Sequence, residues 1–554
     1  MNADWLAYRK VDMSRIRLTG HLLRLLGSGF IHGEIPLAGV RFALRRQQVV
    51  SRVFRYAKHA HVGGKVFVDP FAPYFPSVYF KKVIRNFSQQ TLPPPPNYAQ
   101  ISITNLCPCR CFHCHVQNTQ RGDMPRETIL GLISKLVKHG FPMLFFVGGE
   151  PFSRFDDLVE FVRAAGPHMD TRMFTSGVGA SPDRLARLRA AGLVGVYVSL
   201  DAADPEVHNA KRHHPQAFAS ACDTVRQAVE LGLYVSVVCC TTSTMVRDGS
   251  YRSVVDLAER LGAHSIQLNE IRPVGNAGES SLHDVFLTET DKAALVAYLK
   301  EQNRSSRPIS IAMPWYLEEP YNLGCMATSA QKVYVDAQGH VQPCELLKVS
   351  LGNIQEHDFD DIWNDFRSRC RYPVADCIVW NYRDTLNASP ARPLPPAGTL
   401  ETWPAMTRLP MADTYAGIYG KMLPGAMYSA GYFERKYQLG LRRGIDYAVR
   451  EHSPLAKRLG IRYLALGSTL FSSGAVSEVP HHEFLHIAQF RRFGVPRVIL
   501  HYLRHGIGHL IRTRDLGAAF RDVPFEVEAR AYERICFGQA PAESDSPETR
   551  TVVA

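Results

Sequence analysis

Residues 100–114 read Gln-Ile-Ser-Ile-Thr-Asn-Leu-Cys-Pro-Cys-Arg-Cys-Phe-His-Cys, an apolar, strand-like stretch that runs into a cysteine-rich loop. In this loop Cys107, Cys111 and Cys114 are separated by three and then by two residues. Three thiolates on one loop can bind three irons of a 4Fe–4S cubane and leave the fourth iron open for another ligand. A zinc loop is the alternative, but zinc usually takes four protein ligands arranged as paired Cys-x2-Cys units. The spacing therefore favours an iron–sulfur cluster.

Strand-like and helix-like segments alternate after this loop, and many of the helical segments end at glycine. The expected strands are Gln100–Thr104, Met143–Val147, Thr171–Phe174, Gly195–Leu200, Leu233–Cys239 and Ser265–Asn269, and the expected helices include Arg126–Lys138, Pro182–Ala191, Phe218–Leu231 and Ser253–Leu261. Near-continuous apolar strands between helices indicate a parallel sheet with helices outside. The sequence therefore predicts an α/β fold, a partial (β/α)6 TIM-like barrel, with its chemistry at the carboxyl ends of the strands.

Further motifs follow the expected strands in order. They are Gly148-Gly149-Glu150-Pro151 after the second strand, Thr175-Ser176-Gly177 after the third, Ser199-Leu200-Asp201 after the fourth, and then His208-Asn209-Ala210-Lys211-Arg212. Together with the cysteine loop they resemble the radical S-adenosylmethionine (SAM) superfamily, over about Pro96–Ser310. The resemblance implies that Gly148, Gly149 and Glu150 bind the SAM amino group, that Ser199 and Asp201 contact the ribose, and that Arg212 pairs with the SAM carboxylate. Glycines permit close backbone approach, and a carboxylate suits an ammonium.

Three positions depart from the pattern of that superfamily. His113 stands where an aromatic residue usually precedes the third cysteine, and its imidazole can still stack near the adenine. Asn209 and His213 replace the Asp and Gly of the HDxxRG stretch. Cys109 lies inside the loop and is not part of the motif, so we expect it not to be a ligand.

The resemblance implies a reaction and its cofactors. The cluster and SAM together yield a 5′-deoxyadenosyl radical that abstracts hydrogen from a substrate carbon, while the barrel positions the substrate and excludes competing reactions. An external one-electron donor of the flavodoxin or ferredoxin type would reduce the cluster.

A second group of cysteines follows the barrel. Cys325 and Cys344 form a C-x13-G-x4-C pattern around an expected hairpin, Lys332–Val335 and His340–Gln342, and Cys370 and Cys377 follow an expected helix at Phe359–Arg367. Four thiols can enclose a complete cluster, although a zinc knot is the alternative. The stretch of about Pro314–Trp380 resembles the twitch domain, the shortened form of the SPASM domain. This resemblance implies one auxiliary 4Fe–4S cluster on these four cysteines. Cys222, Cys239, Cys240 and Cys536 are expected to be buried structural residues.

The C-terminal region carries the motif HExxH. On a helix, His482 and His486 face the same way and can bind one zinc ion, with Glu483 as the general base on a metal-bound water. The region of about Met411–Phe537 resembles mainly helical HExxHxxQ metallopeptidase-like (zincin) domains, in which a later acidic helix completes the site. That resemblance points to Glu528 as third ligand. Glu526 competes with it, and His501, His505 and His509 remain alternatives. A degenerate domain kept for substrate docking is the other interpretation.

Length and composition limit the remaining possibilities. At 554 residues the chain should form several domains. We expect a basic N-terminal extension (1–95), the radical SAM barrel (96–310), the twitch/SPASM-like domain (311–387), a proline-rich linker (388–410) and the metallopeptidase-like domain (411–554). With 45% hydrophobic and 21% charged residues, the composition is that of a globular protein. Neither a signal core nor a membrane-spanning stretch is evident, so we expect a cytoplasmic protein.

The net charge of +12 is concentrated at the N-terminus, where residues 1–60 hold eleven Lys/Arg and three Asp/Glu. A basic amphipathic helix there would lie on an anionic membrane surface or hold a peptide or nucleic acid. Packing on the main domain with the charges in water is the plainer interpretation.

Three functions compete. The first is radical SAM modification of a ribosomally made peptide or protein, with a peptidase-like domain that binds or trims it. The second is modification of a small molecule or lipid at a membrane surface. The third is a non-catalytic metal-binding scaffold or regulator, against which the intact cluster motif and SAM pocket argue.

Overall fold

The computed structural model describes most of the first 381 residues and parts of the C-terminal region. The described residues are 56–116 without 90 and 92, 122–278, 283–319, 322–374 without 348 and 371, 377–381, 448–458, 462–466, 469–474, 481–496, 498–500, 502–503, 529–530 and 532, with scattered positions between 23 and 44. The chain divides into two compact units, the first comprising Met1–Glu318, Cys325–Pro373 and Cys377–Thr407. The second comprises Glu319–Gly324, Val374–Asp376 and Arg408–Ala554.

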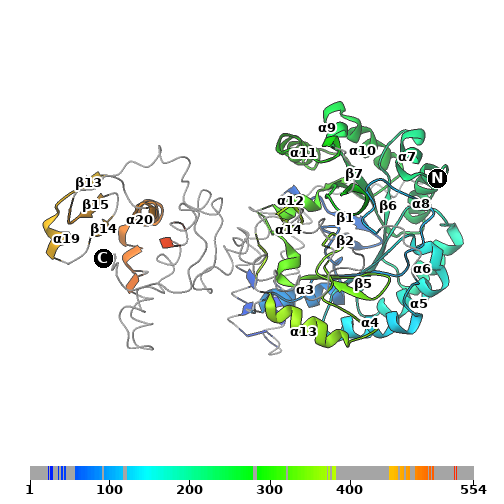
Figure 1. Cartoon of the computed structure of the whole chain (residues 1–554), viewed down its shortest axis with the longest axis horizontal. Helices are drawn as coiled ribbons and strands as arrows, with labels where there is room; N and C mark the ends of the chain where they lie inside the picture. Colours follow the sequence, from blue (N-terminus) through cyan, green and yellow to red (C-terminus); the bar gives the residue numbers. More distant parts are fainter. Residues whose placement is uncertain are drawn as a thin grey trace. The chain divides into compact units, whose positions relative to one another are not determined.

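A ten-stranded sheet forms the centre of the first unit (Figure 1). Its order is β12 (Gly352–Asn353), β11 (His340–Gln342), β10 (Lys332–Val335), β3 (Tyr98–Ser102), β4 (Met143–Val147), β5 (Asp170–Thr175), β6 (Gly195–Ser199), β7 (Tyr234–Thr241), β8 (Ser265–Glu270) and β9 (Ser310–Ala312). Each neighbouring pair of strands from β10 through β3 to β9 is parallel. β11 pairs antiparallel with both of its neighbours, β10 and β12. The prediction of a parallel α/β sheet in a partial barrel is confirmed.

Helices connect the parallel strands and lie around the outside of the sheet (Figure 1). They are α3 (Val78–Ser88), α4 (Arg126–Lys138), α5 (Phe155–Ala165), α6 (Pro182–Ala191), α7 (Pro205–Arg212), α8 (Ala217–Glu230), α9 (Ser243–Asp248), α10 (Ser250–Arg260), α11 (Glu289–Gln302), α12 (Pro314–Glu318), α13 (Phe359–Arg369) and α14 (Ile378–Asn381). α6 illustrates their boundaries, since Ser181 caps its first turn by accepting from the Arg184 amide and Gly192 ends it in the left-handed region. No described helix is both long and apolar enough to cross a membrane.

The predicted elements agree closely with the observed ones. All six expected barrel strands are present with ends shifted by at most two residues, and α4, α6 and both hairpin strands have the expected bounds. The sequence prediction missed β9, because three residues are too few to reveal a periodicity.

A segment before the barrel closes the amino-terminal end of the sheet. It includes the hairpin β1 (Ala60–Val62) and β2 (Lys65–Phe67) and continues to Tyr74, packing with residues of the barrel interior. Arg172, fully buried near the start of β5, donates to the carbonyls of Pro70 and Ala72 and forms an ion pair of 2.9 Å with Asp170. Its guanidinium also lies over the rings of Phe67 and Tyr234. Most of the basic segment before residue 56 lies outside the described residues. Its described residues include Leu26, Ile35 and Ala43, which are buried in one cluster with side chains of β2 and α3.

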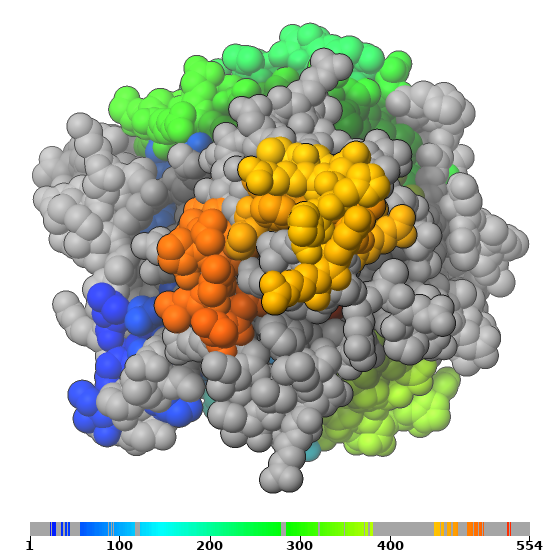
Figure 2. Space-filling model, turned by 90° about the vertical axis from the view of Figure 1, so that its left-hand side faces the viewer, coloured from blue at the N-terminus to red at the C-terminus, as the bar shows by residue number. Residues whose placement is uncertain are grey.

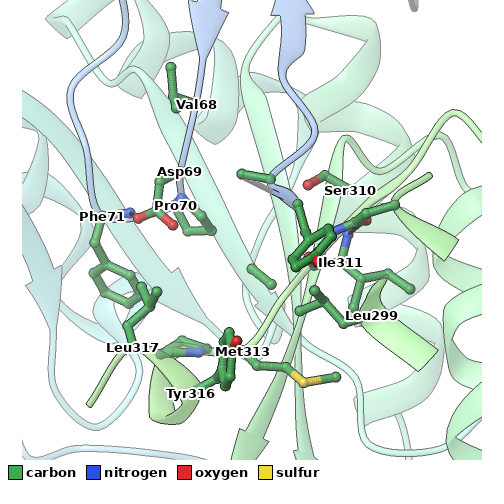
Figure 3. A pocket seen from close by; sticks show the side chains of 15 residues that line it. Val68, Asp69, Pro70, Phe71, Leu299, Ser310, Ile311, Met313, Tyr316 and Leu317 are labelled. Atoms are coloured by element: carbon green, nitrogen blue, oxygen red, sulfur yellow. Dashed lines mark hydrogen bonds between the residues drawn. The ribbon is translucent and has the colours of Figure 1, made fainter. Parts of the chain in front are cut away.

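A mostly apolar cavity of about 530 Å³, counting its open part, borders this closing segment (Figure 3). It is lined by Asp69 and Phe71 on one side and by β9 and α12 on the other. Burial raises the pKa of Asp69 to about 6. None of the cysteines in the described part of the chain lines this cavity, so it is not the predicted cluster site.

The second unit contains a small sheet and a helix. The sheet has the order β13 (Ala448–Arg450), β15 (Thr469–Ser472) and β14 (Tyr463–Leu466), and the short helix α19 (Pro454–Arg458) precedes β14. The longer helix α20 (His481–Phe493) packs against this sheet, and the two lie next to each other in Figure 2 (orange and gold).

Candidate functional site

The cysteine loop begins where β3 ends, at the carboxyl edge of the sheet. Cys111 is buried, whereas Cys107 and Cys114 are half-buried, and none of the three forms a disulfide. The loop is tied to the end of β4 because the Gly149 and Glu150 amides donate to the carbonyls of Thr104 and Leu106 at 2.7 Å each. The three predicted cluster ligands therefore lie at the barrel mouth, as the strand-end rule requires.

Cys109 lies among these thiols. It is buried, and the hydrogen bond between its thiol and that of Cys107, together with burial, raises its pKa to about 11, against the opposing hydrogen bond with Cys111. A thiol with this pKa stays protonated at neutral pH. That Cys109 is not a ligand stays a prediction.

The two glycines of the Gly-Gly-Glu motif are required by the packing of the chain itself. A Cβ on Gly149 would lie 2.2 Å from the Leu106 carbonyl oxygen, and one on Gly148, whose φ is +142°, would lie 2.5 Å from that of Thr104. Only glycine fits so close to another backbone. The sequence predicted that these glycines allow a close backbone approach. In the structure, the backbone that they approach is the start of the cysteine loop, at Thr104 and Leu106.

Glu150 accepts hydrogen bonds with both carboxylate oxygens. Oε1 accepts from the Thr175 hydroxyl and the Phe152 amide, and Oε2 accepts from the amide and hydroxyl of Ser176. Burial raises its pKa, and these four bonds oppose that rise. Glu150 thus joins the ends of β4 and β5, and its expected contact with an ammonium stays a prediction.

Asp201 and Arg212 form a buried ion pair of 2.6 Å between the Asp201 Oδ2 and Arg212 Nη2 atoms. Asp201 Oδ1 also accepts from the Cys240 amide at 2.9 Å. Burial is the largest single influence on Asp201 and opposes its ionisation. Arg212, His113, His208 and the hydrogen bond from the Cys240 amide together outweigh burial, and the pKa falls to about 2. Arg212 Nη1 lies 3.5 Å from the Cys111 sulfur, so one guanidinium contacts both the carboxylate and a predicted cluster ligand.

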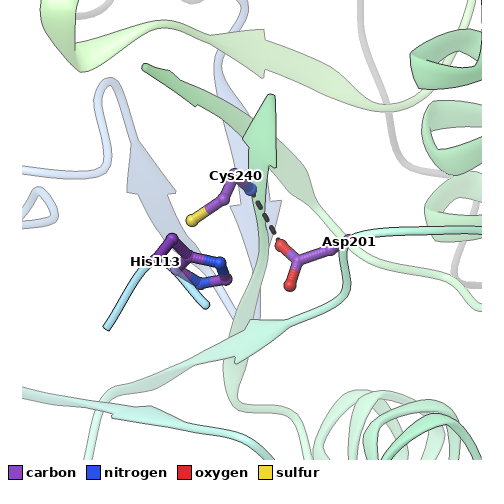
Figure 4. Close-up of side chains that lie close together, drawn as sticks. All are labelled: His113, Asp201 and Cys240. Carbon is purple, nitrogen blue, oxygen red and sulfur yellow. Dashed lines mark hydrogen bonds between the residues drawn. The ribbon is translucent and has the colours of Figure 1, made fainter. Parts of the chain in front are cut away.

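His113 and Cys240 complete this part of the site (Figure 4). One ligand-type atom each of His113, Asp201 and Cys240 lies within 4.8 Å of the other two. Burial lowers the pKa of His113 to about 4, so the ring is neutral at pH 7. Sequence reasoning missed Cys240 and assigned it a structural role. Its place near the carboxyl end of β7 was the available signal, since site residues gather there.

The remaining predicted residues are placed as follows. Cys239 and Cys222 are buried, as expected. Ser199 is half-buried at the end of β6, and Cys536 lies outside the described residues.

A loop after β8 supports the cysteine loop and was also missed. The Asn276 amide donates to the Cys114 carbonyl at 3.0 Å, and its side-chain amide donates to the Cys111 carbonyl at 2.9 Å. Gly275, with φ +60°, lies so close that a Cβ would be 2.3 Å from the Cys114 oxygen. No sequence motif marks these two residues.

The predicted auxiliary ligands Cys325, Cys344, Cys370 and Cys377 are all buried, and none of the four forms a disulfide. Burial raises the pKa values of Cys325, Cys344 and Cys377 to about 12. Such thiols become thiolates when a metal coordinates them. Cys325, Cys344 and Cys377 also act on one another's pKa, so they lie near each other. Four thiols are the donor set of a 4Fe–4S cluster, and Cys107, Cys111 and Cys114 supply three more with Arg212 beside them. That these thiols bind clusters stays a prediction.

The HExxH motif lies on α20. Glu483 and His486 are buried, and His486 Nδ1 lies 2.7 Å from Gln489 Oε1. The side chain of His482 is outside the described residues, and so are the candidate third ligands Glu528, Glu526, His501, His505 and His509. The zinc-site prediction therefore falls mostly outside the described residues and stays a prediction.

Two stretches of the chain match known families. Residues 101–261 match the Radical SAM superfamily, and residues 325–380 match the iron–sulfur cluster-binding domain SPASM. The chain is 22% identical over 286 residues to an AdoMet-dependent heme synthase of Nitratidesulfovibrio vulgaris. This match covers 47% of this chain and 77% of that protein. It is 26% identical over 262 residues to a PqqA peptide cyclase of Rhodopseudomonas palustris, covering 46% and 68%.

Among solved structures, Streptococcus suis SuiB bound to precursor peptide SuiA aligns with a TM-score of 0.42 and 14% identity. The alignment covers 49% of this chain and 66% of SuiB. The family matches identify a radical SAM enzyme with SAM and 4Fe–4S clusters as cofactors. They do not reach the C-terminal region that holds HExxH.

Proposed function

We propose that this enzyme modifies a ribosomally made peptide or protein by hydrogen abstraction from carbon. When bound, SAM and the reduced cluster supply the 5′-deoxyadenosyl radical. The observation that carries the site assignment is the guanidinium of Arg212, held by Asp201 beside Cys111. This buried cation is suited to the carboxylate of SAM next to the open iron.

The other residues of the site would hold and orient SAM. Glu150 keeps the β4 and β5 turns in place at the amino-group end, Ser199 and Asp201 are available to the ribose, and neutral His113 is available to the adenine. Since Asp201 is already paired with Arg212, its first role is to orient that cation. The burial of this ion pair excludes water from the reacting centre.

The match to a PqqA peptide cyclase supports a peptide substrate. The match to heme synthases makes a small organic molecule the second candidate. With either class of substrate, the correct molecule should increase the formation of 5′-deoxyadenosine. The class whose members cause this increase is therefore the substrate class.

Mass spectrometry of candidate peptides co-expressed with the enzyme tests the proposal. We expect a mass loss or a new crosslink in the peptide, together with 5′-deoxyadenosine. The triple variant Cys107→Ala/Cys111→Ala/Cys114→Ala is the control and should produce neither. Modification of a porphyrin-like or other small molecule, with every peptide unchanged, would favour the second candidate.

Iron analysis tests the ligand assignment. Two cubane clusters correspond to about eight irons per chain, and the triple variant should keep about four. If the triple variant keeps all of them, the assignment of Cys107, Cys111 and Cys114 is wrong.

We also propose a zinc site on α20, with His482 and His486 as ligands, Glu528 as third ligand and Glu483 as general base. The hydrogen bond between His486 and Gln489 supports it. Because an amide oxygen only accepts, Nδ1 of His486 carries the proton, and Nε2 is the unprotonated nitrogen that would bind the metal. Glu483→Gln should retain zinc and abolish any peptide hydrolysis, whereas His486→Ala should lose zinc. Unchanged hydrolysis in Glu483→Gln would remove Glu483 from the mechanism.

Two partners complete the proposal. A flavodoxin- or ferredoxin-type protein supplies the electron, which reconstituted turnover with each donor would test. The basic segment of residues 1–60 contacts an anionic membrane surface, because eleven Lys/Arg oppose three Asp/Glu there. Sedimentation with anionic and neutral vesicles tests this contact, and equal binding to both would contradict it.

A further inference from the structure

Six charged side chains form a connected set of ion pairs beside the auxiliary thiols. They come from β8, the loop after it, α11, α12, β10 and the hairpin that carries Cys344, and they are Glu270, Arg272, Lys292, Glu318, Lys332 and Glu345. We call this set the Lys332 network. All six belong to the first unit, as do the four auxiliary cysteines.

Lys332 is the central cation of this network. Its Nζ atom lies 3.8 Å from Glu318 Oε1 and 3.6 Å from Glu345 Oε2, and only 5% of its side chain is exposed. Glu318 also binds Arg272 at 3.0 Å, and Arg272 in turn contacts Glu270. A buried ammonium persists only where such anions compensate its lost hydration.

The network reaches the thiols through Glu345, which directly follows Cys344 in the chain and whose carboxylate lies 3.6 Å from Lys332 Nζ. Against the effect of burial, Lys332 lowers the pKa of Cys344, and Arg272 lowers that of Cys377. Lys332 also lowers the pKa of Cys325, whereas Glu318 raises it. Lys332 therefore lies close enough to influence two of the four predicted ligands.

The six side chains of the network are together electrically neutral, since three carboxylates balance three cations. Glu289 also pairs with Lys292, at 3.2 Å, but its side chain is exposed, so water and salt screen its charge. A cluster bound by four thiolates carries net negative charge, and reduction by one electron makes it more negative. A fixed, buried cation stabilises the reduced form more than the oxidised form, because Coulomb energy grows with the charge that it faces. Net charge and burial are among the properties that set cluster potentials.

We propose that Lys332 sets the reduction potential of the auxiliary cluster, holding it above the value that the four thiolates and the neighbouring carboxylates would give. The proposal rests on the proposed auxiliary ligands. The step concerned is the uptake of one electron from an external reductant. Lys332 contributes a constant charge to it and transfers no proton.

A redox titration tests this in the full chain carrying Cys107→Ala/Cys111→Ala/Cys114→Ala, so that only the auxiliary cluster contributes to the spectrum. The protein is titrated with dithionite and mediators, and the reduced cluster is followed by electron paramagnetic resonance. Lys332→Gln should lower the ratio of reduced to oxidised cluster at a given potential by roughly tenfold, about 59 mV for one electron. Lys332→Arg should restore the midpoint.

Two further variants provide the controls. Lys82→Gln removes a cation from α3, where Lys82 donates to the His168 carbonyl, and should leave the midpoint unchanged. Glu318→Gln removes an anion from the network and should raise the midpoint. This second variant keeps the test decisive if Lys332→Gln fails to assemble the cluster.

The outcomes separate the charge effect from the ligand assignment. An unchanged midpoint in Lys332→Gln, or an unchanged or lowered midpoint in Glu318→Gln, would overturn the role of Lys332 while leaving the cluster in place. If adding Cys344→Ala to the triple variant leaves the auxiliary signal intact, the ligand assignment itself fails.

Discussion

Substitution of Gly275 by alanine tests whether the loop after β8 positions the cysteine loop. An added Cβ would lie 2.3 Å from the Cys114 carbonyl oxygen and 2.7 Å from the His115 Cα atom. Both neighbours are backbone atoms, which cannot rotate aside as a flexible side chain does. The loop carrying Cys114 must therefore move, and the two hydrogen bonds from Asn276 must weaken with it.

The magnitude has two parts that a control variant separates. The left-handed backbone at φ +60° costs a non-glycine residue roughly 1–2 kcal/mol. Gly249 has φ +77° with nothing within 4 Å of an added Cβ, so Gly249→Ala carries the same strain without the contact. We expect Gly249→Ala to keep both clusters, and Gly275→Ala to lose the SAM-binding cluster and keep the auxiliary one.

Iron and sulfide analysis after anaerobic reconstitution is the assay, together with the rate of 5′-deoxyadenosine formation. Gly275→Ala should fall from about eight irons per chain to about four. Wild-type iron content and an unchanged rate of SAM cleavage in Gly275→Ala would refute the reasoning. Equal losses in both variants would assign the effect to backbone strain.

Three further predictions concern stability and the support of the site. Asp69→Asn should stabilise the protein at pH 8 by up to about 3 kcal/mol and have little effect at pH 4. The folded-state pKa of Asp69 is raised from 3.8 to about 6, so its favourable contribution is present at low pH and is lost as the pH rises through 6; thermal melts at both pH values measure this, and a shift independent of pH would contradict it. Arg172→Met should cost about 3–5 kcal/mol, because it leaves the buried Asp170 carboxylate uncompensated; adding Asp170→Asn should recover part of the loss in denaturant titrations, and no recovery would argue against the ion pair. Asn276→Ala removes one hydrogen bond to the Cys111 carbonyl, worth about 1 kcal/mol; iron release to a chelator should be faster than in wild type, and an unchanged rate would show that this bond does not hold the loop.

Local signals gave most of the fold. The bounds of α4 and α6 follow from short-range features, such as the Ser181 cap and the left-handed Gly192, which act over one helical turn. The parallel strands are buried on both faces, so their sequences are continuous hydrophobic runs and do not alternate between apolar and polar residues. Such runs are easily recognised in a sequence. The three residues of β9 carry too little of such a pattern, and their strand conformation depends on pairing with β8.

Long-range packing decided the details of the site. The role of Gly149 follows from the Leu106 carbonyl, which lies more than forty residues earlier in the chain. The closing of the amino-terminal end of the barrel depends on Arg172, whose guanidinium reaches back to the carbonyls of Pro70 and Ala72. These contacts join residues about a hundred positions apart, and no local spacing encodes them.

The sequence by itself determined the chemistry, because Cys107, Cys111 and Cys114 lie on one short loop and their spacing alone limits what they can bind. Only the tertiary structure decided what surrounds that chemistry. It brought Cys240 beside His113 and set Lys332 near the auxiliary thiols. The physical reason is that ligand spacing is a local property of the chain, whereas the electrostatic environment of a ligand is the sum over all charges that folding brings near it.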